Sequence, residues 1–189
     1  MPASSLFVVS GPAGAGKGTL VSRVCERVGN VWVSLSATTR APRGSEVDGV
    51  EYRFLSIAEF ERLIEQDGFI EWARVHSHYY GTPIEPIRQH LADGSIVLLE
   101  IDVQGAMQVK RVFPDATLVF IEPPSMEELE RRLRARATDS EEAIRERLEN
   151  ARGELAAAER YDVRIVNDDV ETATDELVEV IESHVGLAP

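Results

Sequence analysis

The sequence predicts an α/β fold in which helices cover both faces of a parallel sheet. Residues 6–10, 95–102 and 117–121 contain almost no polar side chain, which is typical of strands buried on both sides. Amphipathic stretches with a helical period separate these runs. Only residues 38–82 break the alternation, and their short aromatic runs predict an inserted, mostly antiparallel lobe.

The expected elements follow in chain order. Strands are predicted at residues 6–10, 31–36, 95–102, 117–121 and 163–166, and helices at 17–28, 103–112, from Ser125 onward, 141–160 and 170–184. Pro114 ends one helix, and Ser125 with Glu128 forms a capping box at the start of the next. In the inserted lobe, strands at residues 52–55, 69–75 and 79–80 are expected around a helix near 58–66.

Composition limits the class of protein. The 189 residues suffice for one domain, and the net charge of -13 argues against nucleic acid and anionic membranes as partners. Cys25 is the one cysteine, which excludes an internal disulfide, and we expect a buried thiol. The first residues lack the features of a signal peptide, and no apolar run approaches the roughly 20 residues of a membrane span. We therefore expect a cytoplasmic protein, as a monomer or a small homo-oligomer.

A glycine-rich segment, Gly11-Pro12-Ala13-Gly14-Ala15-Gly16-Lys17-Gly18-Thr19, joins the first strand to the first helix. Glycines in this context let backbone N–H groups converge on phosphate oxygens, and Lys17 can reach the β- and γ-phosphates. We interpret the segment as a phosphate-binding loop for a nucleoside triphosphate. Gly18 stands where a Ser or Thr ligand of Mg²⁺ usually follows the lysine. We therefore assign no direct metal ligand and expect phosphates and water to hold Mg²⁺, with Thr19 or Asp102 as contacts through water.

The predicted lobe contains residue types that suit a purine nucleotide. Arg40 and Arg43 offer planar guanidinium groups that match phosphate oxygens. The Glu71 carboxylate can accept hydrogen bonds from both N1–H and N2–H₂ of guanine. Adenine lacks these donors, so a buried Glu71 would select guanine by a factor of about 10⁴.

The order of these motifs resembles the guanylate kinase family over nearly the whole chain. The resemblance rests on Thr38-Thr39-Arg40, Pro42-Arg43, Glu71-Trp72, Tyr79-Tyr80-Gly81 and Asn167-Asp168-Asp169. It implies a P-loop nucleoside monophosphate kinase that transfers the γ-phosphoryl of ATP to GMP, and also to dGMP, with Mg²⁺. It further implies a core of about residues 1–36, 83–124 and 148–189, a GMP-binding lobe of about 37–82 and an arginine-rich lid of about 125–147.

The same resemblance implies roles for individual residues. The ATP-binding set is Gly11, Pro12, Ala13, Gly14, Ala15, Gly16, Lys17, Gly18, Thr19, Arg132, Arg136, Asn167 and Asp168. The GMP-binding set is Ser36, Arg40, Arg43, Tyr52, Glu71, Tyr80, Thr82 and Asp102. The catalytic set is Lys17, Arg40, Arg136 and Arg147. Ala135 and Ala137 replace glycines that are common in the family, which predicts a more helical lid.

Three alternatives remain open at this level. The arginines of the predicted lid could form a solvated helix face paired with Glu127, Glu128 and Glu130. Lys17-Gly18-Thr19 also resembles adenylate kinases, so another monophosphate, such as AMP, is a second candidate acceptor. The last alternative is a non-catalytic binding module of the guanylate-kinase-like kind, which the intact phosphate loop and Lys17 disfavour.

Overall fold

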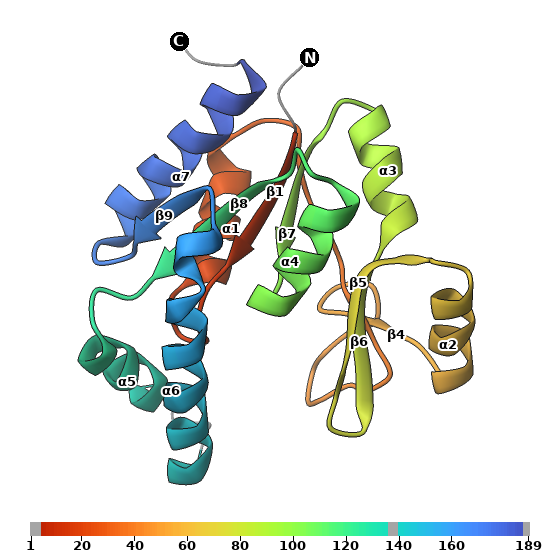
Figure 1. The fold of residues 1–189 in the computed structure, drawn as a ribbon, viewed down its shortest axis with the longest axis horizontal. Coiled ribbons are helices and arrows are strands. Elements are labelled where there is room, and N and C mark those ends of the chain that lie inside the picture. Colours follow the sequence, from red (N-terminus) through yellow and green to blue (C-terminus); the bar gives the residue numbers. More distant parts are fainter. Residues whose placement is uncertain (1–4, 136–139, 187–189) are drawn as a thin grey trace.

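The computed structural model describes residues 5–135 and 140–186, and its centre is a parallel sheet (Figure 1). The strand order is β2-β7-β1-β8-β9. The bounds are Leu6–Ser10 for β1, Val31–Val33 for β2, Ile96–Glu100 for β7, Thr117–Glu122 for β8 and Val163–Val166 for β9. The central strand β1 pairs with β7 and β8, which aligns the carboxyl ends of all three at one edge. Ligands of open α/β sheets bind at that edge.

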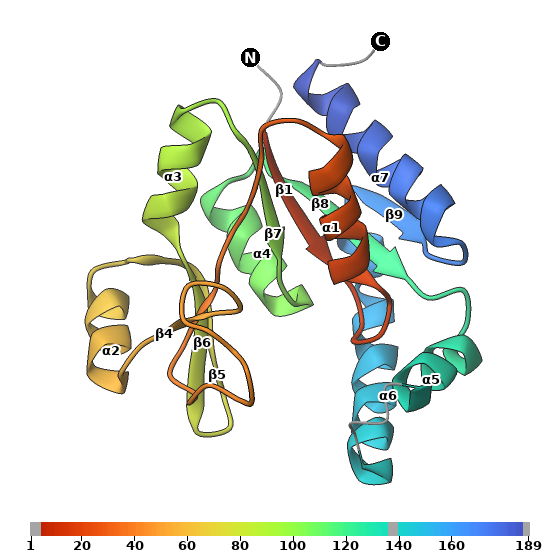
Figure 2. The same cartoon turned by 180° about the vertical axis from the view of Figure 1, so that it is seen from behind.

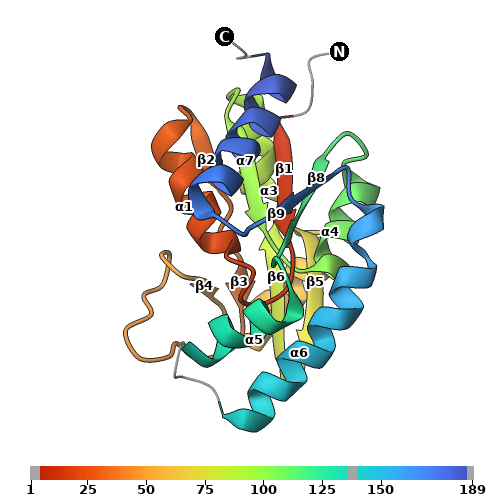
Figure 3. The same ribbon diagram turned by 90° about the vertical axis from the view of Figure 1, so that its left-hand side faces the viewer.

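Helices cover the two faces of this sheet, as the alternation of its strands requires. Side chains at alternate positions of β1 enter two separate cores, with Leu6 and Val8 on one face and Phe7 and Val9 on the other. Helices α3 (Ile84–Ala92) and α4 (Val103–Val112) cover the first face, and α1 (Lys17–Arg27) and α7 (Val170–Val185) cover the second. Figures 2 and 3 show the two helical layers from behind and from the side.

The inserted lobe has its own sheet and a small aromatic core. Its strand order is β4-β3-β6-β5, with β3 at Ala37–Thr38, β4 at Arg53–Phe54, β5 at Phe69–Val75 and β6 at His78–Pro83. Helix α2 (Ile57–Glu65) begins at a capping box formed by Ser56 and Glu59. Its Phe60 is fully buried and stacks on Phe69 and Tyr79, with ring centroids 4.2 and 5.2 Å away. The β3–β4 pair is parallel and the other pairs are antiparallel.

Two helices form a second projection from the main sheet, opposite the lobe in Figure 1. They are α5 (Met126–Ala135) and α6 (Glu141–Ala156), and a 3-10 turn, η1 (Ala158–Arg160), follows. Leu129 and Leu133 of α5 pack against Ile144 and Ala151 of α6. Helix α5 is helical through Ala135, whereas Ala137 lies outside the described residues.

The predicted fold class is confirmed, with local differences that have physical causes. Strand β2 ends at Val33 rather than at residue 36, because the chain there leaves the main sheet and joins the lobe as β3. Helix α3 is not among the predicted elements, although Ile84, Ile87 and Leu91 repeat with a helical period. Cys25 is exposed rather than buried, since the inward stripe of α1 runs through Leu20, Val21 and Val24.

None of the helices within residues 5–135 and 140–186 combines the length and apolar character needed to cross a bilayer.

Candidate active site

The glycine-rich loop lies at the carboxyl edge of the main sheet, where β1 ends and α1 begins. Gly14 and Gly16 adopt φ values of 93° and 97°, a region that favours glycine. Gly16 is also the N-cap of α1, and no side chain caps this helix end. The N–H groups of the first turn of α1 point out of the helix end, and these groups and the helix dipole therefore both favour an anion in front of the loop.

Lys17, the first residue of α1, folds back over this loop. Its Nζ donates to the carbonyl oxygens of Gly11 at 2.7 Å and Pro12 at 3.2 Å. These bonds hold the ammonium group at the mouth of the loop, where it lines the cavity with Gly18 and Thr19. Phosphate oxygens bound there would meet a cation already in place.

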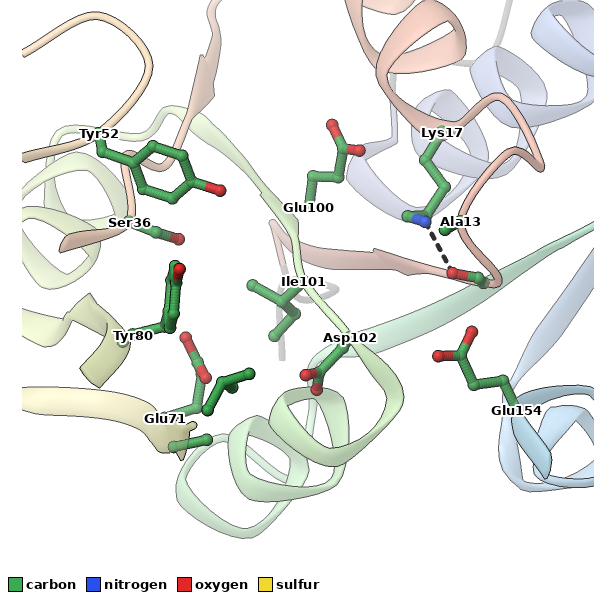
Figure 4. A pocket seen from close by; sticks show the side chains of 14 residues that line it. Ala13, Lys17, Ser36, Tyr52, Glu71, Tyr80, Glu100, Ile101, Asp102 and Glu154 are labelled. Atoms are coloured by element: carbon green, nitrogen blue, oxygen red, sulfur yellow. Dashed lines mark hydrogen bonds between the residues drawn. The ribbon is translucent and has the colours of Figure 1, made fainter. Parts of the chain in front are cut away.

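A single cleft of about 390 Å³ connects the loop to the inserted lobe. Ala13 and Lys17 line one end, and the opposite end is lined by Ser36, Tyr52, Glu71 and Tyr80, as the close-up in Figure 4 shows. Glu100 and Asp102, at the end of β7, lie between the two groups. The structure thus brings much of the predicted donor and acceptor sets to one cavity.

Glu71 is the buried carboxylate of the cleft. It lies on β5, and only 9% of its surface is exposed. The Thr82 hydroxyl donates to Oε1 of Glu71 at 2.5 Å, and Ser36 lies 3.2 Å from the same hydroxyl. A Cβ added to Gly105 would lie 3.0 Å from Oε2, so α4 closes the other side of the carboxylate. Burial raises the pKa of Glu71 to about 7, with the nearby Asp102 contributing in the same direction.

Asp102 also has a structural task, because it is the N-cap of α4. Its Oδ1 accepts a hydrogen bond from the backbone N–H of Gly105 at 2.8 Å. Thr82 is fully buried and does not line the cleft, so its direct partner is the Glu71 carboxylate. Ser36, Glu71 and Asp102 of the predicted GMP-binding set therefore line the cavity, whereas Thr82 supports Glu71 from behind.

Arg40 is held by Glu46, which is not among the predicted site residues. Its guanidinium forms two hydrogen bonds to Glu46, at 2.8 and 3.0 Å, and a third to the Ala41 carbonyl at 2.7 Å. The Tyr52 ring lies 5.5 Å from the Arg40 guanidinium carbon. The backbone N–H of Arg43 donates to Glu46 as well, at 2.7 Å. Glu46 thus holds the Arg40 side chain and the Arg43 backbone in position. In the sequence, the only sign of this role is the three-residue spacing between Arg43 and Glu46, which resembles that of a capping interaction.

The arginines of the predicted lid have different surroundings. Arg131 and Arg132 both bond to Glu128, as the alternative of a paired helix face requires, but Arg132 also donates to the Asn167 carbonyl at 2.9 Å. Arg132, Asn167 and Asp168 line a second cavity beside Gly14 and Gly16. Arg147 lies on α6, and Arg136 is outside the described residues.

Two further carboxylates reach the donor end of the cleft. Glu100 lines both the main cleft and the cavity of the phosphate loop, and a Cβ on Gly18 would lie 3.4 Å from its Oε2. Glu154 projects from α6 toward the same loop (Figure 4). Burial raises the pKa of both side chains, and the positive charge of Lys17 opposes the shift. Glu154 was not predicted, because one glutamate in a charged helix carries no distinctive pattern.

The family described as guanylate kinase matches the chain over residues 3–184. A guanylate kinase of Gloeobacter violaceus is 56% identical over 174 residues, which cover 92% of this chain and 85% of that protein. A guanylate kinase of Thermobifida fusca is 52% identical over 176 residues, with coverages of 93% and 90%.

A solved structure gives the same result in three dimensions. The crystal structure of guanylate kinase from Anaplasma phagocytophilum superposes with a TM-score of 0.76 at 34% identity, covering 94% of this chain and 84% of that one. A shikimate kinase structure from Bacteroides thetaiotaomicron, at 17% identity and a TM-score of 0.52, shares the fold alone.

Proposed function

Because the chain belongs to the guanylate kinase family, we propose that it transfers the γ-phosphoryl group of ATP to GMP, giving ADP and GDP. The observation that carries the proposal is the composition of the single cleft. One end has a phosphate-binding loop with Lys17, and the other has a buried carboxylate, Glu71, beside Tyr52 and Tyr80. Arg40 does not line the cleft itself, and its guanidinium carbon lies 5.5 Å from the centroid of the Tyr52 ring. The two ends suit a triphosphate donor and a purine monophosphate acceptor in one cavity.

The donor end is assigned to ATP. The backbone of the loop and the first turn of α1 would bind the phosphates, and Lys17 would neutralise the oxygens of the β- and γ-phosphates. The cavity beside Gly16, lined by Asn167 and Asp168, lies next to the loop and is our candidate for the adenosine moiety.

The acceptor phosphate is assigned to the arginine and tyrosine cluster of the lobe. Glu46 accepts hydrogen bonds from Nη1 and Nη2, along one edge of the Arg40 guanidinium. Because the guanidinium has five N–H donors, further donors remain for a phosphate. Arg43, Tyr52 and Tyr80 would add directed donors around the same oxygens. The tyrosine rings lie edge to face, with centroids 6.2 Å apart, which places both hydroxyl-bearing rings on one side of the cleft.

The base is assigned to Glu71, supported by Ser36 and Thr82. The ionised carboxylate would accept hydrogen bonds from N1–H and N2–H₂ of guanine, and the Thr82 hydroxyl keeps Oε1 in place. Adenine presents an acceptor at N1, so it would leave the buried carboxylate without donors. The 2′-hydroxyl has no assigned partner in this scheme, so dGMP is proposed as a second acceptor.

Mg²⁺ is proposed to enter with ATP. No group of three or more His, Cys, Asp or Glu side chains is arranged as a metal site in the described part of the chain. The oxygens near the loop nevertheless suit Mg²⁺, which keeps several waters: the Thr19 hydroxyl and the carboxylates of Glu100 and Asp102. When bound, the ion supplies positive charge to the transferring phosphoryl group.

The chain's contribution to the transfer is alignment and charge. A phosphate oxygen of GMP forms a bond to Pγ while the bond from Pγ to the bridging oxygen of ADP breaks, so no covalent protein intermediate is required. Lys17 and Arg40 hold the reacting groups from opposite ends, and Arg147 and Arg136 are proposed to balance the charge on the transferred group. Closing the cleft would exclude water, which otherwise accepts the phosphoryl group.

The proposal is tested by offering each nucleoside monophosphate with ATP and Mg²⁺ and measuring ADP formation. GMP should be the preferred acceptor, followed by dGMP. AMP in place of GMP would support the adenylate kinase alternative, and ATP binding without turnover on any acceptor would support the binding-module alternative.

The base assignment is tested with Glu71→Gln. The amide offers one acceptor and two donors where guanine needs two acceptors, so we expect kcat/KM for GMP to fall by about a hundredfold or more. Binding of ADP, measured by calorimetry, should stay within about twofold. An equal loss for both nucleotides would contradict the role of Glu71 in reading the base.

A further inference from the structure

Asn167 connects three parts of the molecule at the turn between β9 and α7. Its side chain is almost fully buried, with 5% of the residue surface exposed. Its Nδ2 donates to the Ala15 carbonyl in the phosphate loop at 2.7 Å. Its own carbonyl accepts from Arg132 of α5 at 2.9 Å, and its backbone N–H donates to Glu122 at the end of β8 at 2.8 Å.

The side-chain amide fits closely against the loop. Gly16 has φ of 97°, and a Cβ at this position would lie 2.3 Å from Nδ2 of Asn167. The loop can approach the amide only because residue 16 is a glycine. The amide therefore holds the carbonyl that immediately precedes the N-cap of α1, in the stretch whose N–H groups face a bound phosphate.

Helix α5 contacts both the loop and the turn that contains Asn167. A Cβ on Gly14 would lie 3.1 Å from side-chain carbons of both Leu129 and Leu133, so the buried leucines of α5 press on the loop backbone. Arg132 is fixed at both ends of its guanidinium, by Glu128 at 2.8 Å and by the Asn167 carbonyl. Loop, turn and helix thus share buried contacts.

We propose that Asn167 is a positioning residue that sets the shape of the phosphate loop through Ala15 and couples the loop to α5 through Arg132. This inference rests on the proposed function, since it concerns the ATP side of the same site. It differs from the expectation that Asn167 serves ATP as a direct ligand, because its Nδ2 is directed at the protein backbone. The donor site then depends on a side chain that need not touch the nucleotide.

The test compares Asn167→Asp and Asn167→Ala with Asn30→Asp. The first two remove the Nδ2 donor, with and without a new negative charge, and leave the Ala15 carbonyl buried and unpaired. Asn30 makes the same kind of bond, from Nδ2 to the Gly94 carbonyl at 2.9 Å, but at the opposite end of the sheet. It is therefore a matched control for loss of an amide-to-backbone bond.

We expect both Asn167 variants to bind ADP about tenfold or more weakly in calorimetry and to raise KM for ATP similarly, while KM for GMP stays within about twofold. Asn30→Asp should change neither ligand by more than about twofold. A loss of ADP affinity smaller than about threefold, or an equal loss for GMP, would overturn the proposal, because a purely structural residue would not distinguish the two substrates.

A measurement on the unmodified chain covers the case in which the variants do not fold. Hydrogen exchange with and without ADP should show added protection in the phosphate loop and also in residues 126–135. Protection confined to the loop would overturn the coupling to α5. Because ADP binding needs no acceptor, these results stand apart from the proposed function, which fails separately if the wild-type chain forms no GDP.

Discussion

At the scale of single residues, the proposed role of Glu71 in binding guanine requires a charged carboxylate, whereas the stability of the fold favours a neutral one. Its pKa is about 7 in the folded chain, against an ordinary value of 4.5, because burial disfavours the charged form. Guanine, in turn, needs the charged form as acceptor. If Glu71 reads guanine as proposed, binding requires a charge that the folded interior disfavours, which is common at binding sites.

This conflict predicts a pH dependence of stability. The folded chain binds the Glu71 proton more tightly than the unfolded chain, so the stabilisation is complete below about pH 4.5 and is lost as the pH rises through about 7. The shift corresponds to a free energy on the order of 3 kcal/mol. Glu71→Gln should therefore be more stable than wild type at pH 8 and nearly equal at pH 4.5, in urea unfolding without nucleotide. A difference that does not vary with pH would contradict this account.

Glu46 leads to a second prediction about one side chain. It binds both the Arg40 guanidinium and the Arg43 backbone, so Glu46→Gln should loosen the phosphate-binding cluster. We expect KM for GMP to rise by about tenfold, with kcat and KM for ATP nearly unchanged. Glu51→Gln is the control, because Glu51 accepts only the Val47 N–H among the bonds described in the same loop. Similar effects of the two substitutions would show that the loop, rather than the arginine pair, is responsible.

At the scale of elements, α4 shows how one residue can serve a helix and a site together. Asp102 caps the helix through Oδ1 and also lines the cleft. Asp102→Asn preserves an oxygen acceptor for the Gly105 N–H, whereas Asp102→Ala removes it. Both should weaken GMP binding, but only the alanine variant should lose about 1 kcal/mol of unfolding free energy. Equal stability of the two variants would mean that the cap contributes nothing measurable.

The elements also differ in how far the sequence alone could predict them. The predicted bounds of β1 and β8 agree with the structure to within one residue, because strands buried on both faces leave an uninterrupted apolar run. The bounds of β9 also agree, although only Ile165 is buried there. Helix α3 was missed, since Pro86 and the exposed polar residues around it resemble a loop, although proline is tolerated in a first helical turn. The predicted strand at residues 31–36 is longer than β2, which ends at Val33, because the sequence does not show where a chain passes from one sheet to another.

Prediction of the site had a similar limit. Residues in ordered motifs, such as Lys17, Glu71 and Tyr80, could be named from sequence and do line the cleft, while their individual roles stay predictions. Residues whose role is to hold other side chains or the backbone in place could not be named from the sequence. Glu46 and the amide of Asn167 owe their importance to partners that the fold brings near, and for Asn167 the partner is 152 positions away in the chain.

At the scale of the whole molecule, two projections lie on opposite sides of the molecule, the inserted lobe and the α5–α6 pair (Figures 1 and 2), and residues of both line the cleft. We predict that binding both substrates draws them together, because the proposed role of Arg147 on α6 requires it to approach a phosphoryl group between Lys17 and Arg40. Small-angle scattering should show a smaller radius of gyration with a bisubstrate analogue than without ligand. ADP alone should give a smaller change, and unchanged scattering with the analogue would contradict the proposed closure.

Three cations near the cleft already have an anionic or carbonyl partner: Lys17 has two backbone carbonyls, Arg40 has Glu46, and Arg132 has Glu128. An incoming anion must therefore displace or share these partners rather than fill an open positive field. Inorganic phosphate makes too few contacts to compensate for the partners it displaces, whereas a nucleotide also gains contacts through its base and sugar. We therefore expect the cleft to bind a nucleotide much more tightly than inorganic phosphate.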